Sequence, residues 1–120
     1  MPSLVLETNV QLPNTKQFVT SFSKLAAATL SKPEKYITVS YRYNEFLSWE
    51  GTFDPAFLLT VTSLDNISPQ LNDGYSKTFF EFFEKELHVP GSRGYITFFD
   101  PGRANLGHEA TTFATIFGSK

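Results

Sequence analysis

Pro2 is the residue of this sequence whose position could give it chemistry of its own. It directly follows Met1 and precedes an alternating apolar segment that begins at Leu4. A small residue in second place normally permits removal of Met1, and Pro2 would then carry a free secondary amine. The pKa of an α-amino group lies nearer neutrality than that of a lysine, and burial beside a cation would lower it further. The alternative is that Pro2 only supports methionine trimming and opens an edge strand, and on Pro2 alone this alternative is favoured.

Two histidines and an acidic neighbour are the other candidate chemical groups. His88, His108 and Glu109 could suggest a metal site, but they lack the close spacing that metal ligands show. Two surface histidines are therefore the favoured interpretation. The chain has no Cys, which excludes disulfides, thiolate metal sites and cysteine nucleophiles.

Composition predicts one folded domain over residues 1–120. The chain is 41% hydrophobic with thirteen Phe, enough for a single core. A net charge of −2 without a basic stripe argues against nucleic acid as a partner. The sequence has neither a basic signal-peptide start nor an apolar run of membrane-spanning length, so we expect no membrane association. Together with the absence of Cys, this predicts a cytoplasmic protein.

The elements that must position Pro2 begin with a strand, a helix and a second strand. Residues 4–10 alternate between apolar and polar, which predicts a strand. Asn14, with Gln17 three residues later, predicts a capped helix start, and Pro33 ends that helix. Residues 36–43 alternate again and predict the second strand. The core face of the helix is expected to carry Phe18, Val19, Phe22, Leu25, Ala26, Thr29 and Leu30.

The same order of elements then repeats. Residues 44–55 predict a connecting loop, and the β-branched and apolar residues 57–63 predict a central strand. A long helix is expected from an N-cap at Ser68 to about Leu87, followed by a strand over residues 95–99. The core face of this helix is expected to carry Leu71, Tyr75, Thr78, Phe79, Phe82 and Phe83.

Two consecutive strand–helix–strand units predict an α+β fold. Each unit must pair its strands in parallel through a right-handed crossover. The joined units form a four-stranded mixed sheet with both helices on one face. The other face includes apolar residues from several strands, so we expect other subunits to cover it.

The order of short motifs along almost the whole chain resembles the family of macrophage migration inhibitory factor and D-dopachrome tautomerase. The motifs that carry this resemblance are Met1-Pro2, Thr8-Asn9-Val10, residues 32–37, Asp54-Pro55, Ser63-Leu64, Tyr75-Ser76-Lys77, Tyr95-Ile96, Phe99-Asp100, residues 104–107 and Thr112-Phe113. No single motif is specific for the family, but the whole set in this order is a strong indication of it.

The resemblance implies a homotrimer around a central channel. It also implies keto–enol tautomerisation of a small aromatic 2-keto acid, such as phenylpyruvate, or of a dopachrome-like substrate, without cofactor or metal. In that reaction Pro2 would be the catalytic base and then the acid. The implied substrate-binding residues are Lys32, Leu64, Tyr95, Thr97, Leu106, His108 and Phe113.

The implied roles compete with simpler ones. Lys32 would bind the substrate carboxylate, yet a lysine just after a helix end also complements the helix dipole. Leu64 would offer a backbone N–H. Tyr95 would close the pocket from the adjoining subunit, whereas the simpler interpretation makes it a core tyrosine, like Tyr36. The residues implied as apolar walls, Leu106 and Phe113, would otherwise be core residues.

The sequence departs from the family at several places. Thr97 stands where the family usually has Asn, and His108 stands where mammalian members have Trp. Ala56 and Leu59 replace the Cys-x-x-Cys of the mammalian cytokine, so thiol-based redox activity should be missing. The glycine pair of the central loop has become Glu50-Gly51, and a tail of residues 114–120 extends past the family's usual end. These changes bear on substrate preference and rate more than on fold.

A second hypothesis is a cytokine-like interaction protein whose pocket is weak or vestigial. The family includes ligands of protein receptors that are exported without a signal peptide, so secretion stays open beside a cytoplasmic location. Retention of Pro2 and Lys32 favours the enzyme, whereas Thr97 and His108 favour functional drift.

Overall fold

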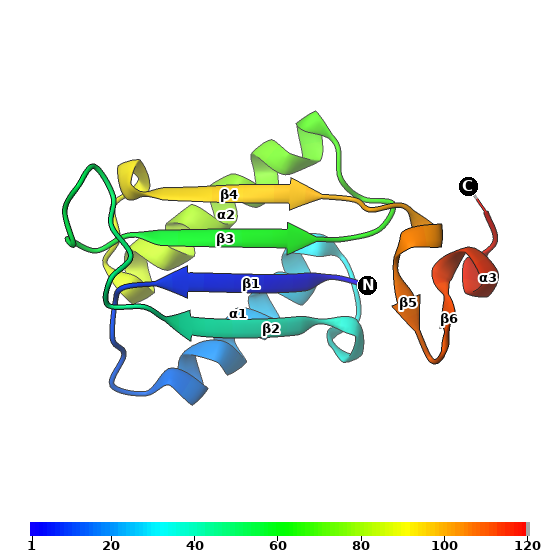
Figure 1. Ribbon diagram of the computed structural model, residues 1–120, viewed down its shortest axis with the longest axis horizontal. Helices are drawn as coiled ribbons and strands as arrows, with labels where there is room; N and C mark the ends of the chain where they lie inside the picture. Colours follow the sequence, from blue (N-terminus) through cyan, green and yellow to red (C-terminus); the bar gives the residue numbers. More distant parts are fainter. Residues whose placement is uncertain (120) are drawn as a thin grey trace.

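The computed structural model describes residues 1–119 and contains one four-stranded mixed sheet with two long helices on one face (Figure 1). The strand order is β2-β1-β3-β4. The strands are β1 (Ser3–Thr8), β2 (Thr38–Tyr43), β3 (Phe57–Thr62) and β4 (Gly94–Phe99), and the helices are α1 (Thr15–Leu30) and α2 (Pro69–Leu87). The predicted fold class is confirmed.

The register of the sheet decides which chain segments can meet at Pro2. β1 pairs with β2 in parallel and β3 pairs with β4 in parallel, while the central pair β1 and β3 is antiparallel. Ser3 lies opposite Thr38 and Thr62, and Thr62 lies opposite Phe99. The start of β1 therefore meets the start of β2 and the ends of β3 and β4 at one end of the sheet.

Helix α1 forms as its sequence predicts. The Gln17 backbone N–H donates to Asn14 Oδ1 at 3.0 Å, which is the N-cap expected from the spacing. Phe18, Phe22 and two residues at further four-residue steps are buried against the sheet. Val19, Leu25 and Thr29 flank this stripe and are only half-buried.

Helix α2 has the predicted cap at Ser68, whose Oγ accepts from the Leu71 N–H at 3.2 Å. Its buried stripe is Tyr75, Phe79, Phe83 and Leu87. Leu71, expected in the core, is 47% exposed, and this prediction is wrong. The reason is its place in the first turn, where α2 extends past the β4 edge of the sheet (Figure 1). Thr78 and Phe82 are half-buried at the edge of the stripe.

The second strand begins later than predicted. Tyr36 belongs to a 3₁₀ turn, η1 (Glu34–Tyr36), that follows Pro33. The N–H groups of Tyr36 and Ile37 donate to the Pro33 and Glu34 carbonyls at 3.0 and 2.9 Å. Because these N–H groups are bonded within the turn, they do not pair with a neighbouring strand, and the strand starts after them. Tyr36 is 37% exposed, and its interpretation as a core residue is wrong.

A C-terminal unit lies beyond the end of the sheet, on the side where the chain begins (Figure 1). It consists of η3 (Arg103–Asn105), a hairpin of β5 (Gly107–His108) and β6 (Thr111–Thr112), and helix α3 (Phe113–Phe117). Glu109 and Ala110 form the hairpin turn with φ of 51° and 63°, as the twist of a two-residue turn requires. The sequence analysis placed site residues in residues 106–113 without predicting this hairpin, and it indicated a tail over residues 114–120, of which Lys120 lies outside the described residues.

The sheet face opposite the helices carries exposed side chains from several strands. Leu58, Tyr95 and Phe99 are 40%, 67% and 54% exposed there, among Ser and Thr residues. Covering of this face by other subunits remains a prediction. Within residues 1–119, no helix is long and apolar enough to cross a membrane.

Candidate active site

A pocket of about 460 Å³ lies at the end of the sheet where β1 begins. Residues 1–3 form one side of it. The opposite walls come from the turn before β2 and from the C-terminal hairpin and α3. Hollows of about 240 and 470 Å³ also occur beside α1 and at the end of α2, and neither contains a residue predicted for the site.

Pro2 is buried in this pocket. Its carbonyl oxygen accepts a hydrogen bond of 3.0 Å from the Thr38 N–H, which extends the ladder between β1 and β2 by one residue. Leu4 and Leu6, fully buried beneath the helices, fix the strand that follows. The sheet therefore holds Pro2 in place through both its backbone and the strand behind it.

The N-terminal amine lies in an environment that favours its neutral form. Burial, and next the positive charge of Lys32, lower the pKa of the Met1 amine below its ordinary value. The carboxylates of Asp65 and Asp100 act in the opposite direction. Adjacent Cα atoms are only about 3.8 Å apart, so the same groups would surround an amine on Pro2.

Lys32 and Leu64 are not among the residues that line the pocket. Lys32 follows Ser31, the left-handed C-cap of α1, and its N–H donates to the Ala27 carbonyl at 3.0 Å. Its positive charge contributes to the lowered pKa of the Met1 amine, and Met1 lines the pocket. The Leu64 side chain is 2% exposed and belongs to the interior.

Tyr95 and Thr97 lie away from the pocket of their own chain. Tyr95 is opposite Leu58, and Leu58 is opposite Glu7, four residues along β1 from Ser3. At about 3.3 Å per residue, that offset is roughly 13 Å. The Tyr95 ring packs on Trp49 at 4.4 Å and is 67% exposed, so its interpretation as a core tyrosine is wrong.

The C-terminal hairpin and α3 supply an aromatic wall. The rings of His108 and Phe113 are stacked with centroids 5.7 Å apart and planes 7° apart. His108 Nε2 lies 3.5 Å from Glu109 Oε1. The Phe113 N–H donates to the Leu106 carbonyl at 3.1 Å, which returns the chain to the pocket. Of the predicted site residues, the structure thus brings Pro2, Leu106, His108 and Phe113 together.

Lys35 and Tyr36 line the pocket although the sequence did not indicate them as site residues. Lys35 Nζ lies 5.0 Å from the centre of the Tyr36 ring. Both belong to η1, the turn that replaces the predicted start of the second strand. The only indication of them in the sequence was that they belong to residues 32–37, one of the motifs that carry the family resemblance.

Among residues 1–119, no group of three His, Asp or Glu side chains could hold a metal ion. His88 ends α2, and His108 lies in the C-terminal hairpin, with 52% of its side chain exposed. The two histidines therefore belong to separate parts of the surface.

The chain and its fold match known proteins along their full length. A family model described as macrophage migration inhibitory factor matches residues 1–114. Macrophage migration inhibitory factor from Xenopus tropicalis is 31% identical over 117 residues, which cover 95% of this chain and 100% of that protein. A homolog from Trichinella spiralis is 33% identical over 114 residues, which cover 94% and 100%.

Solved structures agree with the sequence matches. The structure of the factor from Trichinella spiralis superposes with a TM-score of 0.87 at 31% identity, covering 92% of this chain and 99% of that one. A homologue from Prochlorococcus marinus has a TM-score of 0.85 at 23% identity, covering 92% and 98%, which shows a shared fold.

The fold and pocket thus define an α+β protein whose mixed sheet ends in a pocket around the chain start. The chain belongs to the macrophage migration inhibitory factor family, which includes tautomerase-type proteins with cytokine roles.

Proposed function

We propose that this protein is a keto–enol tautomerase that acts on aromatic 2-keto acids or dopachrome-like compounds, with Pro2 as its acid–base group once Met1 is removed. The observation that carries the proposal is the burial of Pro2 in a pocket where the amine of the adjacent Met1 has a lowered pKa. A base that is neutral near physiological pH is what proton abstraction beside a carbonyl requires.

The reaction moves one proton and one electron pair within the substrate. The neutral Pro2 amine takes a proton from the carbon next to the carbonyl, and the C–H electrons form the carbon–carbon double bond of an enolate. The protonated amine then returns the proton to the enolate oxygen, which gives the enol. The reverse steps convert enol to ketone, and neither direction consumes a cofactor.

The walls of the pocket suit an aromatic acid. His108 and Phe113 present a stacked pair of rings, and Tyr36 lies on another wall. Lys32, which acts on the amine, and Lys35, which lines the pocket, supply positive charge for the substrate carboxylate. The backbone N–H of Leu64 is proposed to stabilise the oxygen on which charge develops.

A homotrimer would complete the site. Tyr95 is too far along the sheet to reach Pro2 of its own chain, and it is exposed beside the uncovered sheet face. Packing of that face against a second copy would allow Tyr95 and Thr97 to enter the neighbour's pocket.

The direct test is conversion between enol and keto phenylpyruvate by protein whose N-terminus is verified as Pro2. We expect turnover that disappears in the Pro2→Ala variant, because its primary amine lacks the ring that fixes the direction of the lone pair. A Pro13→Ala variant, changed in the loop before α1, serves as the matched control and should keep full activity. Absence of turnover in the verified wild-type protein would refute the proposal.

A further inference from the structure

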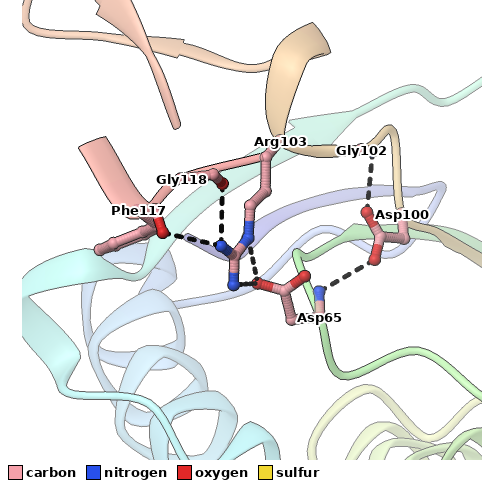
Figure 2. Close-up of polar contacts among 6 residues, drawn as sticks. All are labelled: Asp65, Asp100, Gly102, Arg103, Phe117 and Gly118. Atoms are coloured by element: carbon pink, nitrogen blue, oxygen red, sulfur yellow. Dashed lines mark hydrogen bonds and ion pairs between the residues drawn. The ribbon is translucent and has the colours of Figure 1, made fainter. Parts of the chain in front are cut away.

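Arg103 joins three segments of the chain, as Figure 2 shows. Its Nε and Nη2 atoms lie 3.0 and 2.9 Å from Asp65 Oδ2, in the turn between β3 and α2. Its Nη1 atom donates to the carbonyl oxygens of Phe117 and Gly118, both at 3.0 Å. The Arg103 and Asp65 side chains are 20% and 27% exposed, so water screens the pair less than it screens an open surface pair.

The end of α3 depends on these contacts. A helix leaves its last carbonyls without intrahelical partners, and a helix of five residues is not stable by itself. An arginine beside the last turn both binds such carbonyls and complements the negative end of the helix. The Arg103 guanidinium also lies over the Phe117 ring at 5.7 Å, so it holds this residue by two kinds of contact.

From the end of α3, ring contacts lead to the pocket. The Phe117 and Phe113 rings are stacked at 5.2 Å, and the Phe113 and His108 rings are stacked at 5.7 Å. Phe113 is 1% exposed, and both Phe113 and His108 line the pocket. Packed side chains therefore connect Arg103 to the aromatic wall without a gap.

On its other side, Arg103 binds one of two carboxylates that act on the N-terminal amine. Asp65 has a left-handed backbone, with φ of 67°, and its N–H donates to Asp100 Oδ2 at 2.9 Å. Asp100 Oδ1 accepts from the Gly102 N–H at 2.9 Å. The charged and titratable groups around the amine or in the pocket are Lys32, Asp65, Asp100, Lys35, Tyr36, His108 and Glu109.

We propose that Arg103 is a positioning residue of the tautomerase site, which fixes the aromatic wall and shields the catalytic amine from the negative charge of Asp65. This inference rests on the proposed function. Neither contact requires Arg103 to touch the substrate.

The two effects can be separated in full-length protein with a verified Pro2 terminus. Arg103→Met should raise the KM for phenylpyruvate about three- to tenfold, the effect of losing one or two hydrogen bonds, with a smaller change in kcat. It should also move the acidic limb of kcat/KM to higher pH, because Asp65 favours the protonated amine more strongly when the Arg103 charge beside it is removed.

Two further variants assign each effect to its cause. Arg103→Lys keeps the positive charge but lacks the planar guanidinium that binds Asp65 and the two carbonyls together. KM should therefore stay raised, while the acidic limb returns to its wild-type pH. Adding Asp65→Asn to Arg103→Met removes the negative charge of Asp65, so the acidic limb should return to its wild-type pH while KM stays raised. Lys77→Met, at an exposed position of α2, is the control and should change neither quantity.

Hydrogen exchange at residues 113–117 tests the same contacts without catalysis. We expect faster exchange there in Arg103→Met and in Arg103→Lys, the second of which keeps the inference testable if the first does not fold. Unchanged exchange in a folded variant, or an unchanged KM together with an unchanged pH limb, would overturn the inference. If verified wild-type protein is inactive, the proposed function fails, and the exchange measurement alone decides the positioning role.

Discussion

His108 lies parallel to Phe113, with ring centroids 5.7 Å apart and planes inclined by only 7°. Phe113 is almost fully buried, while half of the His108 side chain is exposed. The imidazole is thus the outer face of the aromatic wall, and an aromatic substrate in the pocket would meet it before it met Phe113.

Replacing His108 by Trp should strengthen the binding of aromatic ligands. A larger ring face adds about 0.5–1.5 kcal/mol of stacking beyond burial, or roughly two- to tenfold in affinity. Inhibition by a competitive aromatic acid measures this. His88→Trp, on the separate surface at the end of α2, should leave affinity unmoved. Equal affinities in wild-type protein and the His108 variant would place His108 outside the binding region.

Removing the Lys32 charge should change the pH dependence of activity. Lys32 lowers the pKa of the Met1 amine, and we expect it to act in the same direction on the Pro2 amine of processed protein, so Lys32→Met should move the acidic limb of kcat/KM to higher pH. Activity at neutral pH should fall about ten- to hundredfold, since an ionic hydrogen bond to the carboxylate is lost as well. Lys24→Met, exposed on α1, should keep the wild-type profile. An unchanged pH profile in Lys32→Met would mean that Lys32 only complements the dipole at the end of α1 and does not act on the site.

A site shared between subunits predicts complementation. Pro2→Ala protein lacks the ring that directs the lone pair of the base, and Tyr95→Ala protein lacks the residue that closes the pocket, so each should be nearly inactive. Unfolded and refolded together, they should form mixed trimers in which some pockets have both residues. Regained phenylpyruvate turnover, with a trimer mass from light scattering, is the expected result. An active monomer at micromolar concentration would rule out the shared site.

Phe83 should be among the residues most important for stability. It is fully buried, and its ring lies 5.1 Å from that of Phe22 and 4.7 Å from that of Phe57. Phe83→Ala should lower the free energy of unfolding by about 3–5 kcal/mol, because it removes apolar contacts and leaves a cavity. Phe46→Ala, at a position 72% exposed, should change it by less than about 0.5 kcal/mol. Urea unfolding of the two variants makes the comparison.

Local signals in the sequence were sufficient for most of the fold. Asn14 and Ser68 cap the two long helices as expected, because an N-cap requires only one side chain and a backbone N–H three residues away. Phe18 and Phe22 in α1, and Phe79 and Phe83 in α2, are buried at four-residue steps. Leu71 is exposed although it lies at a core position of the helical pattern. Its exposure depends on where the sheet ends, and the periodicity of the helix sequence carries no information about that.

The pocket was harder to predict because its walls are distant in sequence. Pro2 and Phe113 meet only because the C-terminal hairpin returns past the end of the sheet. Lys35 and Tyr36 reach the pocket through a 3₁₀ turn, and an alternating pattern predicts a strand at that place. Arg103 carried no sequence signal, since its Asp65 partner is distant and its other partners are backbone carbonyls.

The measurement that tests the central claim most directly compares two forms of the same chain. Protein that keeps Met1 has an amide nitrogen on Pro2, which has no basic lone pair, whereas processed protein has a free amine. Intact mass spectrometry separates the forms, and each is assayed for phenylpyruvate tautomerisation. We predict activity in the processed form only. Equal activity in the two forms would contradict a mechanism based on Pro2.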